Sequence, residues 1–542
     1  SVKQLISIKS VNISFYTILD KCRDIILNKK PGKNTLLYLL YNMDNRIINN
    51  QLNDKPCQGL SNLYLKNGCI PFEKMPYCTS LIQHNPQIYC LLKSIPFTNR
   101  EHEMLARYIK NNAEIEDNLF TDIKDIECFG DIDSLIEKYN NNLYHTHTGR
   151  QLKKYNDYIY IDSYISDSTI IIKKLKELSQ DGVAQYTPSI DSWLSKESYS
   201  IDDNDKIQIL RKMFEKSHVS LIYGSAGTGK STLIRHIANF WSKQNKIFLA
   251  ITHSAVENMK RKVQAANSKF TTIAKFISPK NTTTNYDIMF IDECSTVSNN
   301  DMRCILEKGS FKLLVLVGDT YQIESIYFGN WFSIAKKFIP NTSIFELVNP
   351  FRTSNDSLLK LWSSVRKLDN SILELLVANN YVTSLDESIF NKISDDEIVL
   401  CLNYDGLYGI NNINYFLQNN NPNEKVVWGI NSYKIGDPIL FNEFNEFSPL
   451  IYNNSKGKIV GIQLMDDYIK FEIELEESIN EIDAFGYNFD LIDKSISGKS
   501  VISFKIYRSK STDDDDYNHS TQVPFQVAYA ISIHKAQGLE YD

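Results

Sequence analysis

A glycine-rich run that ends in lysine and serine constrains the fold of this chain more than any other feature. Residues 224–231 read Gly-Ser-Ala-Gly-Thr-Gly-Lys-Ser, which fits the pattern G-x-x-x-x-G-K-[ST]. An apolar run at residues 219–223 precedes it, and residues 233–238 have helical spacing. In the order strand, loop and helix, such a loop wraps phosphate with its backbone N–H groups. The sequence therefore predicts a nucleoside triphosphate site on a parallel sheet.

The residues of the loop have expected roles in binding ATP and Mg²⁺. Lys230 is expected to reach the β- and γ-phosphates, and Ser231 is expected to hold Mg²⁺. The glycines keep the loop free of side chains, so that the phosphates can approach the backbone. The residues expected to bind the nucleotide here are Gly224, Ser225, Ala226, Gly227, Thr228, Gly229, Lys230, Ser231 and Thr232.

Two further strand ends carry the polar side chains that ATP hydrolysis needs. Residues 288–291 form an apolar run that ends in Asp292 and Glu293. We expect Asp292 to bind Mg²⁺ and Glu293 to orient and deprotonate the attacking water. Another apolar run, at 314–317, leads into Gly-Asp-Thr-Tyr-Gln, where the amide of Gln322 suits a sensor of the γ-phosphate.

Two single residues complete the predicted site. Gln208 lies 16 residues before Gly224, and its amide can both donate to and accept from adenine. Arg352 can stabilise the charge that spreads over the transferred phosphoryl group. The competing interpretation of both is an ordinary side chain on a surface helix or turn.

The spacing of apolar runs predicts the domain organisation of an α/β protein. From about residue 200 to 342, short apolar runs alternate with helical patterns, which indicates a parallel sheet covered by helices on both faces. Alternation and turn residues later in the chain indicate a small antiparallel barrel. The expected regions are an α+β N-terminal domain of unknown role at 1–200, a first lobe at 201–342, a second lobe at 343–429 and 521–542, and the barrel at 430–520.

Composition excludes several classes of protein. No apolar run reaches the about 18 residues of a membrane span, and the N-terminus lacks the pattern of a signal peptide. The net charge of −6 gives no global attraction to nucleic acid, so any such contact must come from a local basic patch. The nine cysteines show no disulfide pattern, which favours a reducing, cytoplasmic location.

One group of cysteines could be mistaken for a metal site. Cys57, Cys69, Cys78 and Cys90, with His84, are separated by gaps of 11, 8 and 11 residues between successive cysteines. Zinc sites favour closer pairs, so we interpret these residues as buried free thiols.

Together, the motifs from Gln208 to Glu540 resemble those of superfamily 1 helicases, specifically the RecD-like branch, in family order. Residues 252–258 resemble motif Ia, and residues 272–276 resemble the strand-contacting motif after it. Residues 532–540 resemble motif V. The stretches at 436–437 and 452–457 resemble the SH3-like barrel that this branch inserts in its second domain.

The resemblance implies two RecA-like lobes with ATP between them and single-stranded nucleic acid across their tops. Hydrolysis would then move the protein along the strand. The resemblance also implies that the strand is DNA and that movement is 5′-to-3′. By the same resemblance Gly538 would contact the nucleotide. The residues that would contact the strand are Thr252, His253, Thr272, Ser532 and His534, although hydroxyls at such positions also cap helices.

The sequence departs from the family pattern in two places. It ends at Asp542, before the motif that supplies a second arginine to the γ-phosphate, so weak hydrolysis is expected. Only 11 residues separate Phe276 from Ile288, where a strand-splitting pin usually lies. The alternatives are therefore a nucleotide-gated protein that binds a protein partner through residues 1–200, a translocase that does not separate strands, the motor subunit of a helicase–nuclease, and an RNA helicase.

Overall fold

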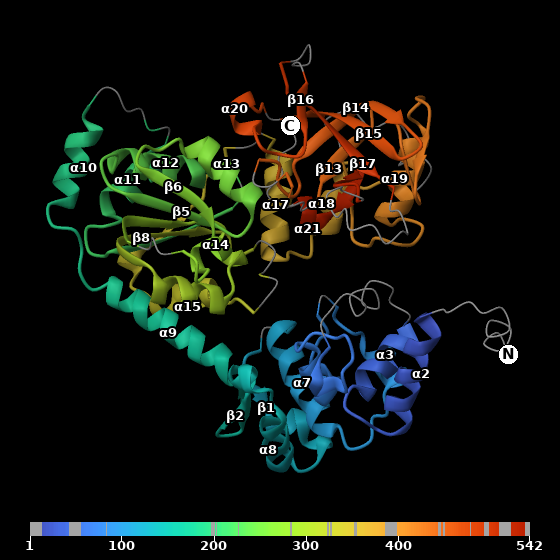
Figure 1. Cartoon of the computed structure of the whole chain (residues 1–542). Helices are drawn as coiled ribbons and strands as arrows, with labels where there is room; N and C mark the ends of the chain where they lie inside the picture. The colour runs from blue at the N-terminus through green and yellow to red at the C-terminus, as the bar shows by residue number, and fades with distance from the viewer. Residues whose placement is uncertain are drawn as a thin grey trace. The chain divides into compact units, whose positions relative to one another are not determined.

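In the computed structural model, a six-stranded, wholly parallel sheet carries the glycine-rich loop (Figure 1). The strands lie in the order β6-β5-β7-β8-β4-β9. The apolar runs expected at 219–223, 288–291 and 314–317 all lie in strands of this sheet, although two of the strands begin three and four residues before the run. The strands are β4 (Val219–Gly224), β5 (Lys246–Ala250), β6 (Ser268–Thr272), β7 (Asn285–Ile291), β8 (Ser310–Gly318) and β9 (Ile344–Leu347).

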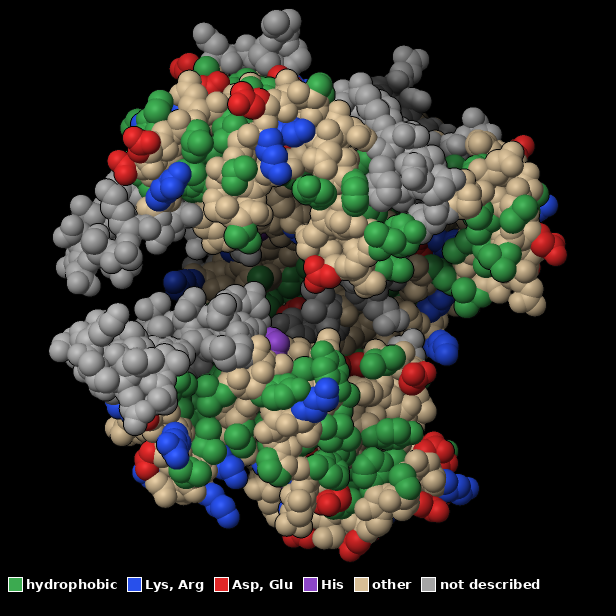
Figure 2. All heavy atoms as spheres, turned by 90° about the vertical axis from the view of Figure 1, so that its right-hand side faces the viewer, with side chains coloured by type: hydrophobic (Ala, Val, Ile, Leu, Met, Phe, Trp, Pro, Cys, Tyr) green, Lys and Arg blue, Asp and Glu red, His purple; other side chains and the backbone are tan. Residues whose placement is uncertain are grey.

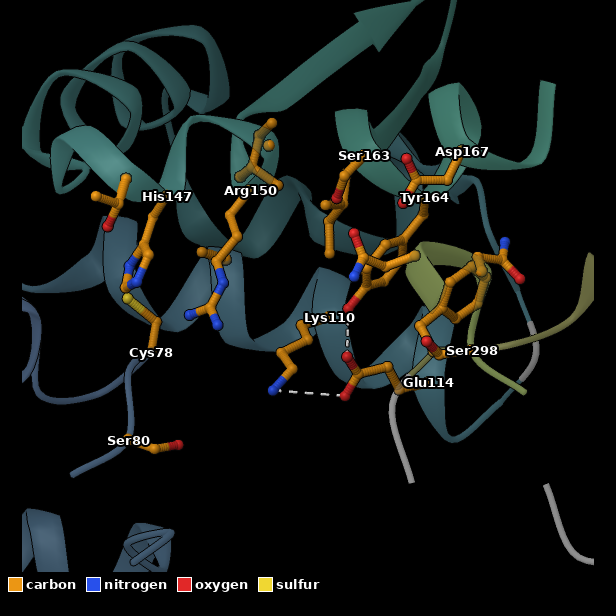
Figure 3. Close-up of a pocket in the computed structure, with 18 of the residues that line it drawn as sticks. Cys78, Ser80, Lys110, Glu114, His147, Arg150, Ser163, Tyr164, Asp167 and Ser298 are labelled. Atoms are coloured by element: carbon orange, nitrogen blue, oxygen red, sulfur yellow. Dashed lines mark hydrogen bonds and ion pairs between the residues drawn. The ribbon is translucent and has the colours of Figure 1, made fainter. Parts of the chain in front are cut away.

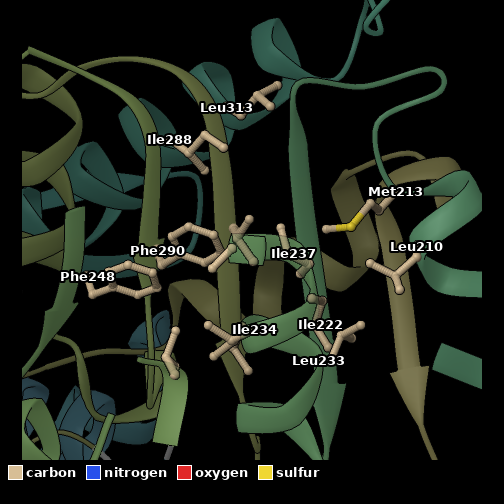
Figure 4. Packing of buried hydrophobic residues seen from close by; sticks show 14 of the residues in the cluster. Leu210, Met213, Ile222, Leu233, Ile234, Ile237, Phe248, Ile288, Phe290 and Leu313 are labelled. Carbon is tan, nitrogen blue, oxygen red and sulfur yellow. The ribbon is translucent and has the colours of Figure 1, made fainter. Parts of the chain in front are cut away.

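Apolar side chains fill the space between this sheet and the helices on one of its faces (Figure 4). Phe248 and Phe290, on neighbouring strands, stack with ring centroids 4.4 Å apart. Ile234 and Ile237 belong to the same buried cluster. Strands β4 and β5 are buried at every position, which is why their sequences are continuous apolar runs rather than alternating ones. This packed centre holds the strand ends, and therefore the loops that follow them, in fixed positions.

Helices cover both faces of the sheet, as the alternating pattern predicts. Figure 1 shows α11, α12 and α13 on one face and α14 and α15 on the other. The helices of this region are α10 (Tyr186–Leu194), α11 (Asn204–Lys212), α12 (Lys230–Phe240), α13 (His253–Val263), α14 (Ile273–Ile277), α15 (Asn299–Lys308) and α16 (Trp331–Phe338), with short 3-10 helices η4 (Cys294–Thr296) and η5 (Asn341–Ser343).

The chain after β9 forms a second α/β region and an antiparallel sheet. Strand β10 (Val399–Cys401) pairs in parallel with β19 (Ala530–Ser532), although the antiparallel sheet lies between them in sequence. That sheet has the order β16-β17-β15-β14-β13-β18. On β15, every second residue is buried, from Ile469 to Leu475, which explains the alternating sequence. The remaining elements are α17 (Asp356–Lys367), α18 (Ile372–Ala378), α19 (Ile410–Asn419), β11 (Val426–Trp428), β12 (Asn431–Tyr433), β13 (Pro438–Phe441), β14 (Lys456–Leu464), β15 (Tyr468–Leu475), α20 (Glu481–Ala484), β16 (Asp490–Ile492), β17 (Val501–Tyr507), β18 (Phe525–Val527) and α21 (Ile533–Ala536).

The N-terminal part is an α+β unit, in which helices surround a small antiparallel sheet of order β1-β3-β2. Strand β3 is the central strand and pairs in antiparallel with both of its neighbours. The elements are α2 (Ser14–Leu27), α3 (Lys33–Asn42), η1 (Gln58–Leu60), α5 (Cys69–Lys74), α6 (Ile88–Ser94), α7 (Glu101–Glu114), β1 (Thr121–Asp122), η2 (Ile123–Phe129), α8 (Ile132–Asn142), η3 (His145–Arg150), β2 (Leu152–Tyr155), β3 (Tyr158–Ile161) and α9 (Asp162–Leu178).

Contacts between residues divide the chain into two compact units. Unit 1 comprises residues 1–173 together with 298–303 and 326–331, and unit 2 comprises the rest. The division falls inside α9, and the expected domain boundary at residue 200 lies outside the described residues. All nine cysteines are free thiols, and Cys57, Cys69 and Cys90 are buried in one apolar cluster of unit 1.

The structure describes residues 14–42, 56–82, 84–116, 118–196, 201, 203–225, 227–281, 285–321, 325, 328–351, 355–384, 398–442, 446–447, 450–476, 478–492, 498–508 and 522–536. In these ranges, no helix combines the length and the apolar character needed to cross a membrane.

Candidate nucleotide-binding site

The glycine-rich loop of unit 2 has the geometry of a phosphate cradle. Strand β4 ends at Gly224 and α12 begins at Lys230, so the loop lies where the first N–H groups of a helix are free to bind an anion. Gly227 and Gly229 have φ angles of +81° and +83°, a left-handed backbone that favours glycine. A Cβ atom on Gly229 would also lie only 2.6 Å from Nζ of Lys206. Glycine is therefore required here both for backbone conformation and for space.

The ammonium group of Lys230 folds back over the loop. Its Nζ donates hydrogen bonds to the carbonyl oxygens of Gly224, at 2.8 Å, and of Ser225, at 2.9 Å. Thr228 closes the turn by donating from Oγ1 to the same Ser225 oxygen, at 2.8 Å. The lysine is thus positioned beside the space that the loop encloses, with partners that phosphate oxygens can replace.

Two carboxylates follow β7 at the same edge of the sheet. Asp292 accepts a hydrogen bond on Oδ1 from the Glu293 backbone N–H, at 2.9 Å. Burial raises the pKa of Asp292. Burial, together with the charge of Asp292, raises the pKa of Glu293 from its ordinary 4.5 to about 7. A carboxylate that exchanges a proton near neutral pH is suited to act as a general base.

The backbone of Glu293 adopts a left-handed conformation, with φ of 54°. This region is strained for a residue with a side chain, by roughly 1–3 kcal/mol, and persists only where neighbours enforce it. Thr296 enforces it here, because its N–H and its Oγ1 both donate to the Glu293 carbonyl oxygen, at 2.8 and 2.7 Å.

A third acid, Asp319, follows β8 and forms an ion pair with an arginine. Arg366 of α17 donates from Nη1 to Oδ2 of Asp319, at 3.0 Å, and its guanidinium lies 4.4 Å from the ring centroid of Tyr321. The side chain of Asp319 is 5% exposed and that of Arg366 is 29% exposed. Because α17 follows β9 in the chain, this contact joins the sheet to the region after it. The sequence alone provides no signal for this pair.

Electrostatic coupling shows that these groups share one site. Burial lowers the pKa of Lys230, while the charges of Asp292, Asp319 and Glu293 raise it and that of Arg366 lowers it. All of these groups except Arg366 follow parallel strands or, in the case of Lys230, the loop after β4. The carboxyl ends of parallel strands meet at one edge of the sheet, which is where open α/β sheets bind ligands.

Comparison with known proteins is consistent with this geometry. Residues 203–387 match the family described as AAA domain. The ATP-dependent DNA helicase Pif1 of Campylobacter jejuni is 25% identical in an alignment of length 400, which covers 61% of this chain and 84% of that protein. These sequence matches support a superfamily 1 helicase.

Solved structures of helicases are among those that align with part of this chain. The Pif1 helicase from Bacteroides in complex with ADP-AlF3 and ssDNA has 15% sequence identity and a TM-score of 0.38, with 64% of this chain and 86% of that chain covered. The Pif1 helicase from Candida albicans has 18% identity and a TM-score of 0.36, with 63% and 88% covered.

Gln208, the residue predicted to bind adenine, and Lys206, two positions earlier, lie in different environments on the same helix. Gln208 is exposed on α11, whereas Lys206 is fully buried, with its ammonium against Gly229 of the loop and 4.3 Å from the ring centroid of Phe351. The structure therefore brings Lys206, and not Gln208, to the loop. The signal was available, because residues 206, 209, 210 and 213 share the buried face of a helix by spacing.

The predicted strand-contacting hydroxyls lie at strand ends and cap helices. Thr252 and Thr272 follow the neighbouring strands β5 and β6, and each accepts a hydrogen bond from the N–H three residues later, at 3.2 and 3.3 Å. Ser532 does the same at 3.2 Å after β19, and His253 is exposed at the start of α13. A hydroxyl that accepts in a cap can still donate its proton to a phosphate. On the face shown in Figure 2, described acidic and basic side chains are interspersed among side chains of other types.

Several predicted site residues cannot be located. Ala226, Gln322, Arg352 and Gly538 lie outside the described residues, as does the side chain of His534. Ser231 and Thr232 lie in the first turn of α12 and are half-buried, next to Lys230.

Proposed function

We propose that this chain is an ATP-dependent DNA helicase or translocase of the RecD-like branch, which couples ATP hydrolysis to 5′-to-3′ movement along single-stranded DNA. The observation that carries the proposal is the convergence of Lys230, Asp292, Glu293 and Asp319 at one edge of a parallel sheet, coupled through their charges. A relative named as an ATP-dependent DNA helicase supports DNA as the polymer. Within a cell we place the protein in the cytoplasm, in keeping with its free thiols.

The residues of the loop fit Mg²⁺–ATP. Ser231 and Asp292 would hold Mg²⁺, because hydroxyl and carboxylate oxygens are the ligands that this ion prefers. Asp292 fits this role for two reasons. Burial disfavours its negative charge, which a bound cation would compensate, and its Oδ2 does not take part in the hydrogen bond from the Glu293 N–H. The ion would supply neutralisation of the phosphate charge.

The side chains of the chain then perform the remaining tasks. Lys230 exchanges the carbonyl oxygens of the loop for the β- and γ-phosphate oxygens. Glu293 accepts a proton from the attacking water, which its pKa near 7 permits. Arg352 and Gln322 are proposed to contact the γ-phosphate, and Gln208 the adenine. Strand contacts are proposed for Thr252, His253, Thr272, Ser532 and His534.

The proposal is tested by measuring ATP hydrolysis with and without polynucleotide. We expect single-stranded DNA to stimulate the rate more than RNA or duplex DNA, and Lys230→Ala to remove the stimulated rate. Strand displacement on a duplex with a 5′ overhang, but not on one with a 3′ overhang, would establish the direction. If no polynucleotide stimulated hydrolysis, the motor would be excluded, and an ATP-dependent protein partner would become the better explanation.

One observation favours a second candidate, a translocase that separates strands poorly. Residues 278–284 are all that lie between α14 and β7, and this segment is short for a hairpin that would part a duplex. The two candidates predict different outcomes for one protein. A translocase displaces a bound protein from single-stranded DNA but leaves an overhanging duplex paired, whereas a helicase does both.

A further inference from the structure

Unit 1 contains a cavity of about 930 Å³ that none of the predicted site residues lines (Figure 3). Its volume lies within the range of about 300–1,000 Å³ that is usual for sites that bind small molecules. The wall comes from α7, from η3, and from the first turns of α9 and α15. All of the lining residues belong to unit 1.

One end of the cavity is strongly basic. Figure 3 shows the side chains of Lys110 and Arg150 pointing toward the same open space, with Cys78 in the wall beside it. Burial and the charge of Glu103 raise the pKa of the Cys78 thiol, while the charges of Arg150, Arg107 and Lys110 lower it. Three cations from two elements thus act on a single point of the wall.

The acids at this end are already engaged. Glu103 lies 2.6 Å from the guanidinium of Arg100. Glu114 lies 3.5 Å from Nζ of Lys110 and also accepts a hydrogen bond from the Tyr164 hydroxyl. These contacts account for one acid and one base each, so they leave no negative charge for the other cations.

Arg150 lines the cavity, whereas Arg107 lies behind its wall and is not a lining residue. In the ranges that the structure describes, neither has a carboxylate partner, and the one hydrogen bond of the Arg107 side chain goes to the Tyr77 carbonyl oxygen. Burial and the charge of Arg150 keep the pKa of His147 low, so this ring stays neutral at pH 7. Arg150 therefore brings an uncompensated guanidinium to the wall, and such a group can bind a phosphate in a bidentate manner. Lys110 lies 3.5 Å from Glu114, and its ammonium has three N–H donors, so it can also donate to a phosphate in the same space.

At the other end of the cavity, the negative charges of the acids are compensated by neighbouring groups. Asp167 is paired with Arg303 at 2.8 Å. Asp301 lies in the first turn of α15, where the positive end of the helix dipole stabilises it. The net attraction for an anion is therefore confined to the end that holds Arg150.

An aromatic pair forms the wall at this other end. Tyr164 and Phe328 stack with ring centroids 4.0 Å apart and an angle of 11° between their planes. Buried Asn299 holds the backbone of Phe328 in place, because its backbone N–H donates to the Phe328 carbonyl oxygen at 2.9 Å. Its side-chain amide donates to Ser168 on α9 at 2.8 Å and accepts from the N–H of Trp331 at 3.1 Å. A rigid aromatic wall of this kind can pack against the flat ring of a ligand.

We propose that this cavity binds a small phosphorylated ligand of nucleotide size, with its phosphate at Arg150 and Lys110 and its ring against Tyr164 and Phe328. The site is separate from the glycine-rich loop, since it lies in unit 1 and uses none of the same residues.

Counting the nucleotides bound per chain tests the proposal. Equilibrium dialysis of the full chain with labelled ADP is expected to give two per chain, and one per chain for Arg150→Glu. Lys230→Ala is also expected to give one, from the cavity. The matched control is Arg23→Glu, an exposed arginine on α2 of the same unit, which should leave both. If Arg150→Glu still binds one ADP at the glycine-rich loop, the variant is folded. The proposal would be overturned if the wild-type chain bound only one ADP and Lys230→Ala bound none.

Competitors distinguish the source of the phosphate. Inorganic phosphate should displace ADP from the cavity in the Lys230→Ala variant, and Tyr164→Ala should weaken ADP about fivefold or more while leaving phosphate unchanged. A single-stranded oligonucleotide should not compete. If the oligonucleotide competed and phosphate did not, the cavity would be part of a nucleic-acid track and the small-ligand proposal would be wrong.

Discussion

Arg366 and Asp319, 47 residues apart in the chain, form an ion pair of 3.0 Å whose positive partner also lowers the pKa of Lys230. The arginine comes from α17 and the acid from the end of β8, so the bond joins the region after β9 to the edge of the sheet that we propose to bind phosphate. A γ-phosphate beside Lys230 would offer Arg366 a second anionic partner. The contact therefore gives this chain an arginine that can respond to the state of the nucleotide.

We expect Arg366→Ala to lower the turnover number for ATP by about tenfold or more, with a smaller change in KM, because the charge is needed most as phosphate leaves. The buried Asp319 carboxylate would also lose its partner, at a cost of roughly 1–3 kcal/mol in the free energy of unfolding. Steady-state hydrolysis and thermal unfolding measure the two effects. Lys367→Ala, at the exposed next position of α17, is the matched control. Equal rates for both variants would remove Arg366 from the mechanism.

Glu293 predicts the pH dependence of hydrolysis. As a general base it must be deprotonated, so kcat/KM should rise with pH and level off above about 7, the pKa of this residue in the free protein. Glu293→Gln should still bind ATP, but it should lose turnover and, with it, the rise of kcat/KM with pH. The range from about pH 6 to about pH 8 spans one unit on either side of that pKa. A wild-type kcat/KM that stayed constant over this range would contradict the assignment.

The same shift predicts a change in stability. The Glu293 pKa is about 7 in the folded protein and near its ordinary 4.5 after unfolding. The folded state therefore binds the proton more tightly, and its stability falls as pH rises from about 4.5 to about 7. Glutamine does not titrate, so the melting temperature of Glu293→Gln relative to wild type should rise across this window and stay constant above it. A difference independent of pH would show that the carboxyl group is not buried as observed.

Lys206 should matter more to nucleotide binding than Gln208. Lys206→Ala removes a buried ammonium that packs against Gly229 and the Phe351 ring, so the loop should loosen and the KM for ATP should rise. Gln208→Ala removes an exposed amide two positions away on the same helix and serves as the matched variant. Because Gln208 is proposed to contact the adenine, Gln208→Ala should reduce the preference for ATP over GTP with a smaller rise in KM than Lys206→Ala. An equal or larger rise in KM for Gln208→Ala would contradict the greater role of Lys206.

Two glycines with similar backbones separate conformation from crowding. Gly229 and Gly130 have φ angles of +83° and +93°, so alanine at either position costs about 1–2 kcal/mol in the left-handed region. Only at Gly229 would the new Cβ meet a neighbour, at 2.6 Å from Lys206, whereas nothing lies within 4 Å at Gly130. Gly229→Ala should therefore lower the melting temperature more and abolish ATP binding. Adding Lys206→Ala should restore part of the stability, and its failure to do so would show that crowding is not the cause.

Local patterns predicted much of the first sheet and its loop. The runs before Gly224, Asp292 and Asp319 are continuous and apolar because these strands are buried on both faces, and such runs are visible without any neighbour. Alternation along β15 likewise predicted an antiparallel sheet with one buried face. Both are short-range signals, since each depends on the periodicity of a single element.

The partner of Asp319 could not be predicted in this way. Arg366 lies on a helix whose sequence has ordinary amphipathic spacing, and nothing in that spacing distinguishes it from Lys367. The cavity of unit 1 is a similar case, because Lys110, Arg150 and Phe328 belong to three distant segments. Only packing decides which of many charged residues face the same space.

The sequence by itself determined that a strand, a glycine loop and a helix follow one another at 219–240, and that acids follow the next strands. These are consequences of residue type and spacing within one element. The tertiary structure alone decided that Lys206 rather than Gln208 touches the loop, and that Arg366 pairs with Asp319. The physical reason is that a contact between distant residues depends on how helices rotate and pack against the sheet, which local propensities leave open.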